Sequence, residues 1–246
     1  MEIKKLISIL FLLQISWGFS QTDFEKGNMF YADRKFESAG KSYIAFIKEH
    51  PYDYTAYFNL GNSYFQQKKY ALSLWSYEKS LLIKPNFKDA QINAKKAFEK
   101  TRQPGEWKNA THWVFRILFS VGINFWSYIA VASAILLFVG LFLYFKTFKS
   151  FLRKPLLLAN SLLVIILLGS IVLSGIHYKR LNAHSYGIVI VGSSHAKVAP
   201  ERQEKTAFDI PSGRRVDILQ IEGEWMEVAI DGQHSGWVPT NEIAEI

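Results

Sequence analysis

Two long apolar segments dominate the hydropathy pattern of this chain. They cover residues 125–145 and 155–176, and neither contains a charged side chain. A hydrocarbon core about 30 Å thick needs ~20 apolar residues at helical rise, so each segment is long enough to cross a membrane. The pattern therefore predicts a transmembrane hairpin. The alternative, two buried helices of a soluble core, is disfavoured by this length and by the absence of charge.

A short basic segment, residues 146–154, joins the two apolar segments. Its cations are Lys146, Lys149, Arg153 and Lys154, and it contains no acidic residue. Because cytoplasmic loops are enriched in Lys and Arg, we expect this loop in the cytoplasm. Both flanking portions, residues 21–124 and 177–246, are then expected on the outer side.

Residues 1–20 have the pattern of a secretory signal peptide. Two lysines precede an apolar stretch over residues 6–17, and the small residues Gly18 and Ser20 lie after it at cleavage spacing. The alternative is an uncleaved anchor. Either one delivers the chain from residue 21 onwards to the outer side, which agrees with the basic loop.

Residues 22–102 repeat with a period of 34 residues. The matching pairs are Gly27 and Gly61, Phe30 and Tyr64, Tyr43 and Tyr77, and Pro51 and Pro85. Small residues let paired helices approach closely, aromatic residues fill the space between them, and each proline ends a helix. We expect helices over 22–33, 37–49, 54–66, 70–82 and 88–101, the last acting as a capping helix.

The spacing of the second copy resembles the tetratricopeptide (TPR) signature. The matching residues are Tyr57, Leu60, Gly61, Tyr64, Ser73, Tyr77, Ser80 and Pro85. The first copy is weaker, because Lys26 stands where Leu60 does and Phe46 replaces a small residue. The resemblance implies an all-α TPR array of two repeats, whose concave surface is formed by the first helix of each pair.

Asn28 and Asn59 match two positions that hold an extended peptide in chaperone-adaptor TPR domains. The cations that clamp a peptide carboxylate there do not carry over, since Phe24, Asp89 and Asn93 take their places. The resemblance implies a groove for an internal peptide or a helix, in which the asparagines contribute hydrogen bonds and not fold stability. Apolar contacts are expected from Phe24, Tyr31, Phe58 and Phe65. The alternative is that both asparagines are surface residues of a generic array.

A third apolar run precedes the first span. Trp107, Trp113 and Arg116 accompany it, and it ends at Gly122. Counted together with residues 125–145, it is too long for one crossing. We predict an interfacial helix over 107–122, with tryptophans at headgroup depth and Arg116 reaching towards water.

The pattern changes to a period of two after Tyr186. Strands are expected over 187–191, 213–221, 224–231 and 234–238, with a long turn-rich segment after the first. Gly223 and the pair Asp231-Gly232 mark tight turns. Five or so short strands in residues 185–246 predict a small closed all-β barrel.

This segment resembles bacterial SH3-type domains. The matching residues are Gly213, Val216, Trp225, Val228 and the run Gly236-Trp237-Val238-Pro239. The resemblance implies an SH3-like barrel that binds peptide or cell-wall glycopeptide. Trp225 and Trp237 are candidates for its contact surface, although aromatic residues on strands also serve as core.

Charge and chemistry narrow the function. Residues 22–105 carry a net charge of +5 and residues 183–246 one of −5, and the basic part is expected outside the cytoplasm, so nucleic acid is not an expected partner. The chain has no cysteine, its six histidines are scattered, and it contains neither a His-Glu-x-x-His motif nor a glycine-rich phosphate loop. His184 and His195 alone make a weak metal proposal. We therefore expect a protein that is not an enzyme and that binds neither a cofactor nor a metal ion.

The order of the parts is itself informative. A signal, a TPR array, two spans around a basic loop and an SH3-type barrel occur in this order in E-type proteins of the Bacteroides-type aerotolerance (Bat) operon family, which the whole chain resembles. The resemblance implies a multidomain membrane protein of the bacterial inner membrane, with the TPR array and barrel in the periplasm. It also implies a scaffold that acts with von Willebrand A-domain Bat proteins and membrane lipid, in aerotolerance or envelope stress. Alternatives are a cell-wall-binding anchor acting through the barrel, and a stress sensor or enzyme accessory.

Overall fold

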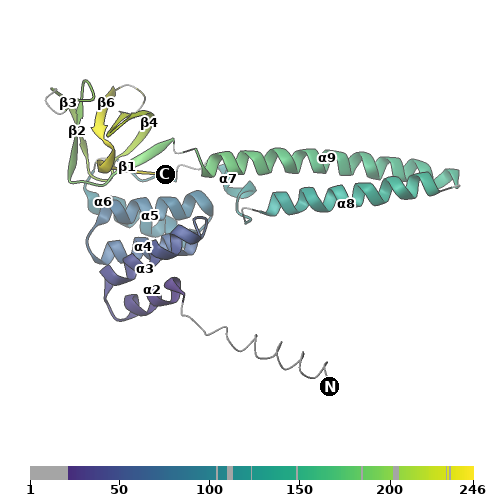
Figure 1. Ribbon diagram of the computed structural model, residues 1–246, viewed down its shortest axis with the longest axis horizontal. Coiled ribbons are helices and arrows are strands. Elements are labelled where there is room, and N and C mark those ends of the chain that lie inside the picture. The colour runs from purple at the N-terminus through teal and green to yellow at the C-terminus, as the bar shows by residue number, and fades with distance from the viewer. Residues whose placement is uncertain are drawn as a thin grey trace, which may run out of the picture.

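The computed structural model describes residues 22–246 except 104, 110–112, 123, 148, 184, 202–204, 231 and 233. The expected signal peptide, residues 1–20, lies outside the described residues. The chain forms a helical array, a long helical hairpin and an antiparallel sheet. Figure 1 shows the sheet stacked on the last helices of the array, with the hairpin projecting to one side of both.

The predicted helices of the array are present, with bounds within one residue of those expected. They are α2 (Asp23–Ala32), α3 (Phe36–Glu49), α4 (Tyr54–Gln66), α5 (Tyr70–Ile83) and α6 (Lys88–Thr101). A Cβ on Gly27 would lie 2.6 Å from the Tyr43 ring, and one on Gly61 equally close to Tyr77. Glycine is therefore required at both positions for the helices of each pair to approach.

The 34-residue period also appears in the backbone. Arg34, Lys68 and Arg102 come after α2, α4 and α6 and have φ angles of 59°, 61° and 59°. Few non-glycine residues adopt this left-handed conformation, so its recurrence marks the same helix-ending turn three times. The expected capping helix, α6, therefore ends in the same kind of turn as α2 and α4, the first helices of the two repeats.

The hairpin consists of α8 (Phe125–Lys146) and α9 (Ser150–Leu181), two helices long and apolar enough to cross a membrane. Residues 146–154 were expected to form a loop, but α9 already begins at Ser150 and includes Pro155 in its second turn, where proline removes one hydrogen bond of the helix. The second helix also continues to Leu181, past the end of the apolar segment at residue 176. There Arg180 donates a hydrogen bond to the Leu82 carbonyl at 3.1 Å, and this contact favours the extra helical turn.

The two helices of the hairpin pack through small residues. Ser127 and Ser174 share a hydrogen bond of 2.8 Å. A Cβ on Gly140 would collide with the Asn160 side chain, so glycine is required at that crossing. Asn160 and Ser170 are buried in this seam.

The helix expected over 107–122 is present only as α7 (Trp113–Leu118). Trp107 lies in non-helical chain because its indole donates a hydrogen bond of 2.7 Å to Glu78 of the array. The short helix packs on the hairpin: Phe119 stacks on His177 with 4.4 Å between ring centroids, and Trp126 donates to the Leu118 carbonyl at 3.1 Å.

Within the described residues the sheet has seven antiparallel strands, against the five or so expected, of which only four had named ranges. The seven strands are β1 (Tyr186–Val189), β2 (Ser193–Lys197), β3 (Thr206–Pro211), β4 (Arg215–Glu222), β5 (Trp225–Ile230), β6 (His234–Pro239) and β7 (Ile243–Glu245), in the order β3-β2-β6-β5-β4-β1-β7. The segment expected to be turn-rich contains β2 and β3. Ile210 of β3 and Ile243 of β7 lie at opposite ends of this order yet share one core, so the sheet wraps around that core.

The array and the sheet form one continuous core. Ile188 of β1 and the C-terminal Ile246 belong to the same buried cluster as Leu74 and Leu81 of α5. The Trp75 indole donates to the Glu245 carbonyl at 2.8 Å, and Gln103 donates to the Gly213 carbonyl at 2.7 Å. A stack of repeats needs its last apolar face covered, and here the sheet covers it.

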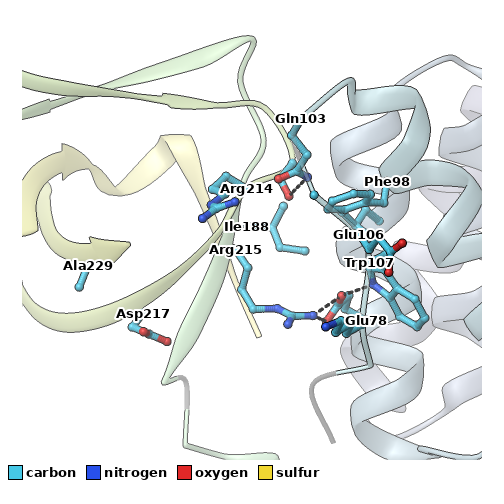
Figure 2. A pocket seen from close by; sticks show the side chains of 14 residues that line it. Glu78, Phe98, Gln103, Glu106, Trp107, Ile188, Arg214, Arg215, Asp217 and Ala229 are labelled. Atoms are coloured by element: carbon cyan, nitrogen blue, oxygen red, sulfur yellow. Dashed lines mark hydrogen bonds and ion pairs between the residues drawn. The ribbon is translucent and has the colours of Figure 1, made fainter. Parts of the chain in front are cut away.

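Figure 2 shows the polar centre of this junction, beside a cavity of about 290 Å³. Glu78 of α5 is only 4% exposed, and its carboxylate oxygens accept from one nitrogen of the Arg215 guanidinium at 2.5 and 2.6 Å. Trp107 donates to the same carboxylate. The Arg215 guanidinium also lies 5.4 Å from the centre of the Tyr186 ring, and burial together with Glu78 raises the pKa of that tyrosine.

We predict that Glu78→Ala destabilises the array and the docked sheet by about 2–4 kcal/mol, because it leaves Arg215 without its buried partner. The measurement is thermal or denaturant unfolding of the purified chain in detergent. Glu37→Ala is the matched control: Glu37 pairs with Lys41 on the exposed face of α3, and its loss should change nothing measurable. Equal unfolding midpoints for the two variants would contradict the importance given to the junction.

Candidate functional site

The first helices of the array, α2, α4 and α6, line one side of it. Tyr31 of α2, Phe65 of α4 and Lys96 of α6 contribute to a hollow of about 350 Å³ there. A second hollow, of about 500 Å³, shares Tyr31 and Gln66 with the first and reaches Arg34. We call the two together the array groove.

Each hollow of the array groove is lined by a cation. Lys96 lines one hollow and Arg34 the other, and among the described residues that line either hollow there is no acid. The aromatic rings of Tyr31 and Phe65 and the amides of Asn62, Gln66 and Asn93 also line the first hollow. The array groove thus offers apolar contact, amide hydrogen bonding and positive charge.

An Asn-Tyr-Asn arrangement occurs twice beside the array groove. Asn28 accepts a hydrogen bond of 2.7 Å from the Tyr43 hydroxyl and one of 3.2 Å from the Asn59 amide. One period later, Asn62 accepts from Tyr77 at 2.7 Å and from Asn93 at 3.1 Å. Both tyrosines are 1% exposed, and burial raises the pKa of Tyr43 to about 12.

The structure places the six expected groove residues in different settings. Tyr31 and Phe65 line the array groove. Phe24 and Phe58 pack between helices, against Tyr43 at 5.8 Å and Phe87 at 5.0 Å respectively. Asn28 and Asn59 bond to each other.

Five residues that line the first hollow were not among the expected groove residues: Asn62, Gln66, Tyr77, Asn93 and Lys96. The 34-residue period could have indicated two of them, because Asn62 is the repeat equivalent of Asn28 and Asn93 that of Asn59.

The second candidate surface is the outer face of the sheet, opposite its core. His195, Lys197, Trp225 and Pro239 line a hollow of about 490 Å³ beside the 3-10 turn η1 (Thr240–Glu242). Met226 and Val228 point into the core, so the alternating Trp225 and Glu227 point outwards. His195 is paired with Asp209 at 2.5 Å on the same face.

Trp237 is 8% exposed but does not belong to the core of the sheet. Its neighbour Val238 does, so Trp237 points to the outer face, where its strand neighbours are Lys197 and Glu227. Of the two tryptophans, Trp225 lines the hollow, whereas Trp237 is buried on the neighbouring strand β6.

Within the described part of the chain, no group of three or more His, Asp or Glu side chains could hold a metal ion. His184, which was considered together with His195 as a metal ligand, lies outside the described residues.

We predict that Asn28→Ala destabilises the array by about 1–3 kcal/mol, because it leaves the buried Tyr43 hydroxyl without an acceptor. Asn59→Ala should cost less, since Asn28 then keeps its bond to Tyr43. Combining Asn28→Ala with Tyr43→Phe should cost less than the sum of the two single changes. Additive losses in unfolding experiments on these variants would show that the bond is not a stabilising one.

Comparison of the chain with protein-family models gives no match, and neither does comparison with curated proteins.

Proposed function

We propose that this protein is a non-catalytic, membrane-anchored interaction scaffold. Its hairpin crosses the bacterial inner membrane, and its TPR-type array and SH3-like sheet lie together in the periplasm. There it assembles a Bat-type complex, with von Willebrand A-domain proteins as partners, in aerotolerance or envelope stress. The observation that carries the proposal is the array groove, two adjoining hollows each lined by a cation.

The chemistry of the array groove supports a peptide ligand of a particular kind. Tyr31 and Phe65 can contact an apolar side chain, and the amides of Asn62 and Asn93 border the same hollow. The cations Arg34 and Lys96 favour carboxylates on either side of that contact. The ligand we propose is an extended or helical segment of a membrane partner, with acidic residues around an apolar anchor.

A second candidate function is attachment to the cell wall through the sheet. It is favoured by the hollow of about 490 Å³ beside Trp225, since an indole face can stack on a sugar ring. In that case the sheet alone would determine the ligand.

Affinity capture from detergent-solubilised membranes tests the scaffold. We predict that Lys96→Glu recovers at least tenfold less of the main partner, because it places like charge opposite the partner's acidic residues. Lys95→Glu is the matched control, since Lys95 is exposed on the same helix and does not line the array groove. Equal recovery by both variants would reject the array groove.

Attachment to the cell wall is tested by a separate binding measurement. If Trp225→Ala abolishes binding to purified cell-wall sacculi while Lys96→Glu leaves partner capture intact, the function belongs to the sheet.

Topology is tested by single cysteines, which the native chain lacks. We predict that Ser193→Cys reacts with a membrane-impermeant maleimide in spheroplasts and that Ser150→Cys is protected. Both serines are exposed, so a difference reports the side of the membrane. The reverse labelling would invert the orientation.

A further inference from the structure

A basic hollow lies where the array meets the base of the hairpin. It has a volume of about 510 Å³ and lies between the start of α6 and the short helix α7. Lys88 and Arg116 are its charged residues, and no acid lines it within the described chain. In the described part of the structure neither cation has an ion-pair partner.

The position of this hollow along the hairpin is fixed by contacts on both helices. Phe119, directly after α7, stacks on His177 near the end of α9. Trp126 at the start of α8 donates a hydrogen bond to the Leu118 carbonyl. Both contacts lie where the apolar part of the hairpin begins and ends, at residues 125 and 176, so α7 sits at the depth of the lipid headgroups.

The walls of the hollow divide by polarity. Asn86, Gln91 and Ser120 supply polar groups next to the two cations. Trp113 and Ile117 of α7 also line it and are 60% and 65% exposed, an unusual exposure for large apolar side chains in water. Tryptophan at the headgroup level and isoleucine in the acyl region are the arrangement expected of a helix in the interface.

We propose that this hollow binds the headgroup of an anionic phospholipid, with Lys88 and Arg116 on the phosphate and Trp113 and Ile117 against the upper acyl chain. The inference rests on the membrane anchoring proposed above. Lysine and arginine both bind phosphate oxygens by charge-assisted hydrogen bonds, and the low dielectric near the bilayer strengthens them. One cation comes from the array and the other from α7, so a bound lipid would link the array to the membrane surface.

The test is native mass spectrometry of the full chain in mild detergent with added phosphatidylglycerol or phosphatidylcholine. The wild type is expected to retain phosphatidylglycerol in preference to phosphatidylcholine. Lys88→Gln combined with Arg116→Gln should lower retention of phosphatidylglycerol about tenfold or more. Lys68→Gln combined with Lys95→Gln removes the same charge elsewhere on the array and should leave retention unchanged.

Inorganic phosphate separates a lipid site from a simple anion site. Phosphate at the same concentration should not displace phosphatidylglycerol, because it lacks the acyl contacts. Displacement by phosphate, equal retention of both lipids, or equal retention by the two double variants would each overturn the proposal. Circular dichroism of each variant establishes folding, and Lys88→Gln alone serves if the double variant unfolds, with an intermediate loss of retention expected.

Failure of this inference differs from failure of the membrane proposal. If alkaline carbonate extracts the wild type from membranes, the hairpin does not span a bilayer and both proposals fall. If the wild type resists extraction but shows no preference for phosphatidylglycerol, only the lipid site is rejected.

Discussion

The buried contact between Glu78 and Arg215 is the constraint on which the docking of the sheet on the array depends. A carboxylate that is almost fully removed from water is costly unless it is paired and hydrogen-bonded. Glu78 lies on α5. It accepts hydrogen bonds from Arg215 of the sheet and from Trp107, which follows α6 in the chain. Without the docked sheet, α5 would carry an unpaired charge beside an uncovered apolar face. The array and sheet are therefore stable as one body rather than as two modules on a tether.

Local features of this fold could be predicted from sequence because short-range rules determine them. The helix bounds in the array result from the 34-residue spacing of glycine, aromatic and proline residues, and the apolar spans from length alone. Strands β2 and β3 were missed because residues such as Ser193-Ser194-His195 lack β-branched alternation, and long-range pairing holds them in the sheet. A long-range contact also explains Trp107, which lies outside its expected helix because its indole donates a hydrogen bond to Glu78 of the array.

The candidate site shows a different limit. Asn28 and Asn59 were singled out by their positions on the first helices, and those positions do face the same side. What the sequence could not indicate is that the Asn28 oxygen supports a buried tyrosine. An exposed amide near a groove serves structure and recognition with the same atoms, so residue type alone does not separate the two roles. Gln66 and Lys96 also line the array groove, and no hydrogen bond to a buried side chain is described for either. Substitutions at these two positions therefore test recognition more directly than substitutions of the asparagines.

Rigid docking of the sheet on the array has a consequence for any ligand. The array groove and the outer face of the sheet belong to one continuous packed unit, so their separation is set by folding and not by a flexible linker. A partner that touches both surfaces loses little further conformational entropy when the second contact forms. The same rigidity means that the base of the hairpin, held by Arg180 on Leu82 and by Phe119 on His177, fixes the height of both surfaces above the apolar segments. Under the proposed scaffold function, recognition would therefore depend on geometry relative to the hairpin as much as on the chemistry of either surface.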